Sequence, residues 1–265
     1  MAHTSTTTDH ATTPGRSAAI TRMLRLLPSA GLTYVAAWVV GLFVAPPAPK
    51  NDAPAAEIHS YFAVHGNAAV VQAVLVHGVA GIALAAMALG LASAFAGHRS
   101  ARLVAATGLA AATVSFGQVI VALCAAYKPA GSSAATTAAW FHAINYADTV
   151  KLMLIAAFAA VVSRADQRVK LSARWVRVLG QVLVPMLVLG GLAFLIDTPL
   201  LDLTLEVSLL LLLTWAARRD LAGWSPYQVT SSAPLPPLPR RLRGPVAPHR
   251  KLRTHIERGS LRQVR

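Results

Sequence analysis

The chain has 265 residues, of which 55% are hydrophobic and 13% are charged. An average soluble domain carries about 25% charged residues, so this composition excludes an ordinary soluble globular fold. The formal net charge is +14, but basic loops beside membrane spans account for such a charge without a nucleic-acid partner. The single cysteine, Cys124, excludes an internal disulfide and a thiolate metal cage.

Six apolar stretches approach or exceed the roughly 20 residues with which a helix crosses a bilayer. They cover residues 27–45, 68–96, 102–127, 137–163, 174–196 and 199–217. Soluble helices that are apolar on all sides would lack the polar surface that keeps them dispersed. The sequence therefore predicts an all-α, polytopic membrane protein with six transmembrane helices.

Arginines precede the first stretch, as they do in a signal peptide. The stretch is longer than a cleaved hydrophobic region of about 7–15 residues. In addition, Pro46 and Pro47 follow where a small-residue cleavage site would lie. We therefore expect a retained signal anchor.

The basic residues predict the orientation of the chain. If the N-terminus is cytoplasmic, only Lys50 and Lys128 of the 24 Lys and Arg residues face outside, and Lys151 lies within a span. Cytoplasmic loops carry an excess of Lys and Arg, so both the N-terminus and the C-terminus are predicted to be cytoplasmic. The Arg, Ala and Pro content suggests a GC-rich bacterial genome, and we expect the bacterial plasma membrane as the location.

Three regions follow from this topology. Residues 1–26 are expected to form a disordered N-terminal segment, and residues 27–217 the six-helix transmembrane domain. Residues 218–265 are expected to form a basic, Pro/Arg-rich cytoplasmic tail that is largely disordered.

Two details of the second and third spans remain open. Residues 54–66 have apolar side chains at helical spacing, which fits either a short amphipathic helix at the outer interface or an extension of the second span. Small residues four positions apart predict close helix contacts in lipid. The pairs and triplets are Ala86, Gly90 and Ala94; Gly108 and Ala112; Thr113 and Gly117.

Polar side chains within the spans form the candidate functional cluster. Ionisable groups inside a membrane are unfavourable by about 2.5–3.5 kcal/mol each on insertion scales, so each needs a reason. The candidates, placed mostly in the outer half of the bilayer, are His77, Gln118, His142, Asn145, Asp148, Lys151 and Glu206. One interpretation is that they line a polar cavity that is open to the outside and holds an ion, a proton or a small polar ligand; the other is that their roles are structural or interfacial.

The fourth span carries most of this cluster. Asp148 and Lys151 are three residues apart and can pair, and Glu206 is a possible second partner of Lys151. The alternative is that His142 to Asp148 are interfacial, and that Lys151 extends its stem outward to water.

We expect no metal, no cofactor and no enzymatic activity. A metal site would use His59, His65, His77, His142 and Asp148, but their spacing matches no known zinc motif. Signatures of nucleotide binding, of serine hydrolases and of zinc proteases are missing from the sequence.

The predicted tail combines prolines with cations. Such a segment beside an anionic leaflet gains up to about 1 kcal/mol per cation, so anionic lipid headgroups are its expected partner. Aromatic side chains do not alternate with these cations, which makes nucleic acid an unlikely partner. The candidate lipid-contacting residues are Arg240, Arg241, Arg243, Arg250, Lys251, Arg253, Arg258 and Arg262.

Three stretches carry a resemblance to a family. They are Pro46-Pro47 with residues 56–65, residues 141–148, and residues 174–180. Together they resemble an uncharacterised family of six-helix integral membrane proteins from high-GC bacteria, over about residues 28–220. The resemblance implies the six-span architecture and no established activity.

Two functional hypotheses result. The first is a non-enzymatic membrane component whose tail docks lipid or a cytoplasmic protein partner, with homo-oligomerisation left open. The second is a small transporter or proton-coupled carrier that uses Asp148 and Lys151, with His77 and Glu206 as further candidates.

Overall fold

The computed structural model describes residues 29–127, 131–170, 172–196 and 198–222. These residues form helices joined by turns and short loops, with no strand among them, which confirms the all-α fold. The predicted N-terminal segment 1–26 and residues 223–265 of the tail lie outside the described residues. The chain divides into the units Met1–Ser225 and Pro226–Arg265, and only the first contains described residues.

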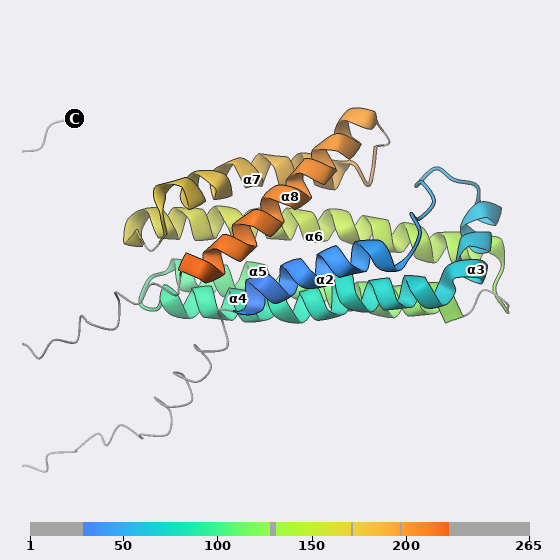
Figure 1. The fold of residues 1–265 in the computed structure, drawn as a ribbon, viewed down its shortest axis with the longest axis horizontal. Coiled ribbons are helices and arrows are strands. Elements are labelled where there is room, and N and C mark those ends of the chain that lie inside the picture. Colours follow the sequence, from blue (N-terminus) through green and yellow to red (C-terminus); the bar gives the residue numbers. More distant parts are fainter. Residues whose placement is uncertain (1–28, 128–130, 171, 197, 223–265) are drawn as a thin grey trace, which may run out of the picture. The chain divides into compact units, whose positions relative to one another are not determined.

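The helices match the predicted apolar stretches to within a few residues at most ends (Figure 1). The predicted sixth span ended at residue 217, whereas the last helix continues into the predicted tail. The helices are α2 (Ala30–Val44), α3 (Ala55–Ala73), η2 (Val74–Val79), α4 (Ala80–Ala94), α5 (Ser100–Tyr127), α6 (Ala134–Val169), α7 (Arg174–Leu192) and α8 (Pro199–Ala222).

The second span is much longer than its apolar run. Helices α3, η2 and α4 follow one another without a break and form a single 40-residue helix, Ala55–Ala94. Residues 54–66 therefore extend the second span, and the alternative of a separate interfacial helix is wrong. The η2 segment is a six-residue π-helix, a rare conformation that in other proteins often occurs at functional sites.

Five helices are long and apolar enough to cross a membrane, counted over the described residues. Helix α2, which corresponds to the first predicted span, has 15 residues, fewer than the roughly 20 of a typical span. Many large apolar side chains point outward from the bundle, as lipid-facing residues do. The most exposed of them include Phe43, Leu200, Val64, Leu210, Ile82 and Ile120.

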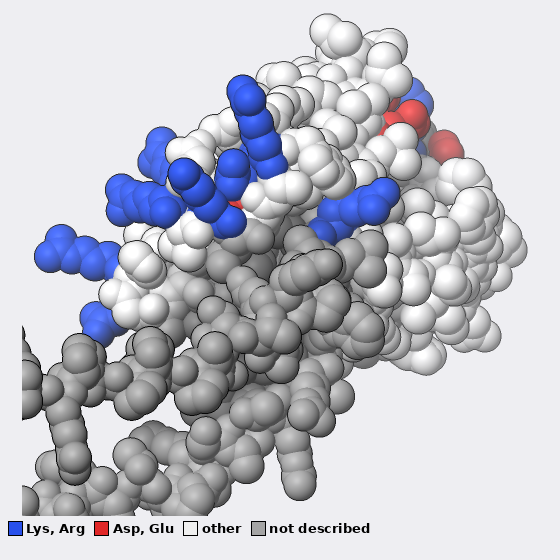
Figure 2. All heavy atoms as spheres, turned by 60° about the vertical axis from the view of Figure 1, so that its left-hand side comes forward, with Lys and Arg blue, Asp and Glu red and all other residues white. Residues whose placement is uncertain are grey.

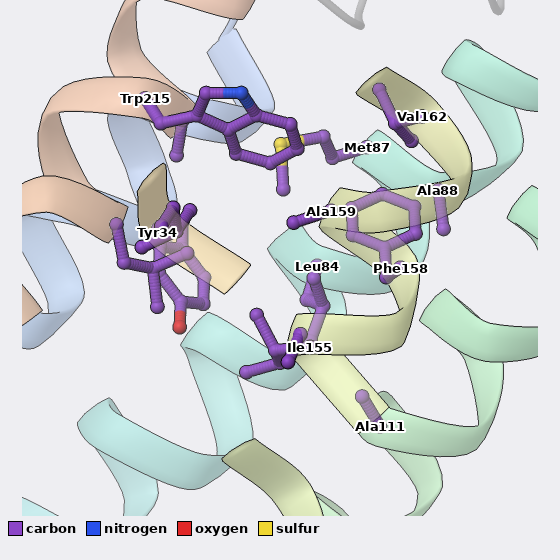
Figure 3. Packing of buried hydrophobic residues seen from close by; sticks show 14 of the residues in the cluster. Tyr34, Leu84, Met87, Ala88, Ala111, Ile155, Phe158, Ala159, Val162 and Trp215 are labelled. Carbon is purple, nitrogen blue, oxygen red and sulfur yellow. The ribbon is translucent and has the colours of Figure 1, made fainter. Parts of the chain in front are cut away.

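The main hydrophobic core lies between α2, α4, α5, α6, α7 and α8. Phe158 of α6 and Trp215 of α8 meet edge to face, with their ring centroids 6.1 Å apart, and Figure 3 shows Met87 and Ala159 beside them. A smaller core lies between α3, α5 and α6, around Ile58 and Phe141. The two cores are separate clusters, and the space between them holds the polar residues described below.

One end of the described bundle is strongly basic, because the α4–α5 and α6–α7 connections and the end of α8 meet there. Figure 2 shows Lys and Arg side chains gathered on this end. The residues of these segments are Arg99, Arg102, Arg164, Arg168, Lys170, Arg174, Arg177 and Arg218. We call this the basic end; the α2–α3 loop, with Lys50 and Asp52, lies at the opposite end.

Small residues allow close contacts between helices, but only at some of the predicted positions. A Cβ atom on Gly108 would lie 2.3 Å from Ala88 Cβ, so α4 and α5 touch through this glycine, and Ala112 is buried beside it. The predicted contact face of Thr113 and Gly117 is wrong, because both are exposed and a Cβ on Gly117 would meet nothing within 4 Å.

The predicted face of Ala86, Gly90 and Ala94 is wrong at Ala94, whereas Ala86 packs against the main core. Ala86 and Gly90 are half-buried and Ala94 is exposed, and Gly81 and Ala88 make close contacts with α5. A small-residue repeat alone does not define which side of a helix faces its neighbour.

Gly108→Ala should destabilise the bundle by about 1–3 kcal/mol, because the added methyl group forces α4 and α5 apart. Thermal unfolding of the purified protein in detergent measures the change. Gly117→Ala, on the same helix but facing outward, is the matched control and should not lower the melting temperature. Equal losses for both variants would contradict the close contact at Gly108.

Candidate functional site

A buried polar cluster surrounds the side chain of Lys151, which lies at the midpoint of the 36-residue helix α6. The ammonium nitrogen is 2.5 Å from Asp148 Oδ1. It donates to Gln118 Oε1 at 3.0 Å and lies 3.1 Å from His77 Nδ1. The Lys151 side chain is 4% exposed and that of Asp148 is 13% exposed. The alternative that Lys151 extends its side chain outward to water is therefore wrong.

The four side chains come from three helices. Asp148 and Lys151 lie one turn apart on α6, Gln118 comes from α5, and His77 comes from η2. Gln118 is itself fixed, because its Nε2 donates to the carbonyl of Ile144 at 3.1 Å. The π-helical turn holds His77 in the bundle interior, where it is 8% exposed.

The hydrogen-bond geometry fits a protonated Lys151. An ammonium has three N–H donors and no acceptor, and Asp148, Gln118 and His77 provide one acceptor atom each. A protonated Lys151 requires His77 Nδ1 as an acceptor, which is the role of a neutral imidazole with its proton on Nε2. Trp38 of α2 adds a fourth contact, since the ammonium lies 5.6 Å from its ring centroid, within cation–π range.

A cavity of about 290 Å³ begins at this cluster and extends toward the α2–α3 loop. Pockets for small molecules in other proteins start at roughly this size, about 300 Å³. Aromatic side chains form much of the wall, and Asn145, Gln72 and the cluster supply the polar atoms. The aromatic lining residues are Trp38, Tyr61, Phe62, Phe141 and Phe194.

The α2–α3 loop is tied across the far end of the cavity. Asn51 in this loop donates to the carbonyl of Phe194 at 2.9 Å and accepts a hydrogen bond from Asn145 Nδ2. The Tyr61 hydroxyl donates to the carbonyl of Pro46 at 3.0 Å. These bonds join the loop to α3, to α6 and to the chain after α7.

The structure brings together five of the seven predicted cluster residues. His77, Gln118, Asp148 and Lys151 contact one another, and Asn145 lines the same cavity. His142 packs beside Phe141 and does not line the cavity.

Glu206 does not belong to the cluster. Its side chain is exposed on α8, and the neighbours on that helix that line the cavity are Leu205 and Leu209. The predicted pairing of Glu206 with Lys151 is wrong, because equal depth along two helices does not fix which side of each helix faces inward.

Sequence reasoning missed Trp38, Asn51 and the π-helical turn. An aromatic residue in an apolar helix gives no sign in the sequence that it will stack on a cation of another helix. Asn51 lies in a polar loop, where the sequence does not distinguish it from its neighbours. Its position before Pro54 and after Pro46–Pro49 marks a short constrained connection, and this is the only sequence signal at that site.

The histidines that a metal site would use are dispersed. His59 Nδ1 lies 3.0 Å from Thr137 Oγ1, and the ring of His65 packs against Tyr61. Within the part of the chain that the structure describes, no three His, Cys, Asp or Glu residues are grouped so that they could hold a metal ion.

Comparison of the chain with models of protein families, with curated proteins and with solved structures finds no match in any of the three. The resemblance to a six-helix bacterial membrane family therefore stays a prediction.

Gln118→Leu should lower the free energy of unfolding by about 1–3 kcal/mol, because it removes an acceptor from a buried ammonium and a donor from the Ile144 carbonyl. Chemical unfolding in detergent measures the loss. Gln72→Leu is the control, because Gln72 lines the same cavity and has no hydrogen bond to the cluster. Similar losses for the two variants would show that Gln118 does not support Lys151.

Proposed function

We propose that this chain is a small proton-coupled carrier of the bacterial plasma membrane, with six spans and both termini in the cytoplasm. The observation that carries the proposal is a buried ion pair, Asp148–Lys151, at the base of an aromatic cavity. Ionisable groups inside a membrane mark ion pathways and proton relays in other membrane proteins. A purely structural bundle needs no such pair, since apolar residues of similar volume often stabilise a protein as well or better.

The unequal packing of the bundle supports a carrier. On the basic side of Lys151, large side chains such as Phe158 and Trp215 fill the interior. On the other side, a cavity of about 290 Å³ lies beside the smaller core around Ile58 and Phe141. A site near the middle of the membrane, with a packed core on one side and a cavity on the other, fits alternating access.

The orientation rests on charge. The basic end carries eight of the described Lys and Arg residues, and cytoplasmic segments are enriched in these residues. With that end inside, the cavity faces outward. In this proposal α2 also crosses the membrane, which brings the number of spans to six. The ring of its Trp38 lies 5.6 Å from the ammonium at the middle of α6.

The other hypothesis, a non-enzymatic membrane component whose basic tail docks anionic lipid or a cytoplasmic partner, depends on residues 240–262. These lie outside the described residues. Lipid binding by the tail is compatible with a carrier and remains a separate proposal.

Proton flux into liposomes tests the carrier directly. The full-length protein is reconstituted with a pH-sensitive dye in the lumen, and carboxylates, amines, sugars and amino acids are added outside. At least one class should drive a proton flux through the wild type. Asp148→Asn combined with Lys151→Met should abolish that flux while the protein still inserts, because the pair that couples ligand to proton is gone.

Asp202→Asn is the control, because it neutralises an exposed carboxylate of α8 and should leave the flux unchanged. A double variant that carries the same flux as the wild type would contradict the role of the pair. If no compound drives a flux above that of protein-free liposomes, the chain is not a carrier.

A further inference from the structure

The positive charge of Lys151 does not depend on Asp148 alone. Three neutral groups also stabilise it, namely Gln118 Oε1 at 3.0 Å, His77 Nδ1 at 3.1 Å and the Trp38 ring. If Asp148 became neutral or moved away, these three contacts would remain. The ammonium is thus a preformed anion site whose resident anion is Asp148.

The site is electrically neutral, with one carboxylate and one ammonium. The other titratable groups near Asp148 are the neutral His77 of η2 and the hydroxyls of Tyr34 and Tyr61, from α2 and α3. Helix α5 contributes Gln118 beside the ammonium, and the cavity residues from α8 and from the chain after α7 are apolar: Leu205, Leu209 and Phe194. A further charge can enter only if an opposite charge enters with it.

The cavity wall selects the rest of the ligand. Five aromatic side chains and several Leu and Ala residues surround about 290 Å³, and such walls favour an apolar body. Sugars and free amino acids would leave their polar groups without partners there, which is unfavourable.

We propose that the cavity binds a monocarboxylate with an apolar body, together with one proton. This rests on the proposed carrier function and names its substrate class. One proton from the outer solution converts the Asp148 carboxylate to the neutral acid, which releases Lys151. The ligand carboxylate then takes the place of Asp148 on the ammonium. The added anion and the added proton cancel, so the site stays neutral and no other group changes charge.

An amine is the opposite case. A cationic ligand would bind Asp148 and would force Lys151 to lose its proton or to leave. Its contacts with Gln118, His77 and Trp38 all oppose that change. The structure therefore favours the anion.

Calorimetry on the full-length protein in nanodiscs tests the inference with three compounds of one shape: benzoate, benzylamine and benzamide. Benzoate should bind the wild type about tenfold more tightly for each unit by which the pH is lowered, because one proton accompanies it. Titrations in two buffers of different ionisation enthalpy should give an uptake of one proton per benzoate.

Single variants test whether Asp148 takes up the proton and whether Lys151 binds the carboxylate of the ligand. Asp148→Asn, which mimics the neutral acid, should bind benzoate with little dependence on pH and without proton uptake. Lys151→Met should not bind benzoate, and Asp202→Asn should behave as the wild type. If Asp148→Asn fails to fold, the proton uptake and the pH dependence of the wild type still decide the matter.

Three results would overturn the inference: no binding of benzoate to the wild type at mildly acidic pH, binding without proton uptake, or tighter binding of benzylamine with proton release. The last result would leave the carrier proposal intact with another substrate class. The carrier proposal fails separately, if none of the compounds added to liposomes drives a proton flux.

Discussion

A lysine ammonium in the middle of an apolar helix bundle is stable only if each of its N–H groups has an acceptor. Lys151 meets this condition through Asp148, Gln118 and His77, with the Trp38 ring as a fourth neighbour. These residues come from α2, η2, α5 and α6, so one ammonium group contacts four helical segments and holds them together. The π-helical turn is part of that arrangement, since it carries His77.

The cluster also separates two kinds of interior. Toward the basic end, Phe158, Trp215 and Met87 pack in the main core, and Gly108 and Gly180 let neighbouring helices touch. Toward the α2–α3 loop, aromatic side chains stand around a cavity, and Asn51 ties the loop across its end. The ion pair lies at the boundary between the two.

The sequence was sufficient for the features that depend on local pattern. Apolar runs located the helices, and the three-residue spacing of Asp148 and Lys151 predicted their pairing, which the structure confirms. Features that depend on the rotation of one helix against another were not predictable. Gln118 and His77 meet Lys151 while Glu206 points outward, and Gly108 touches α4 while Gly117 touches nothing.

A double-mutant cycle between Asp148 and Lys151, measured as the free energy of unfolding in mixed micelles, tests the central claim most directly. Lys151→Met should lose about 3–5 kcal/mol, because it leaves a buried carboxylate unpaired. Asp148→Asn should lose less, because three neutral groups remain with the ammonium. The double variant should lose clearly less than the sum of the two. Additive losses, or a neutral Lys151→Met, would show that the lysine is not held by its partner in the bundle interior.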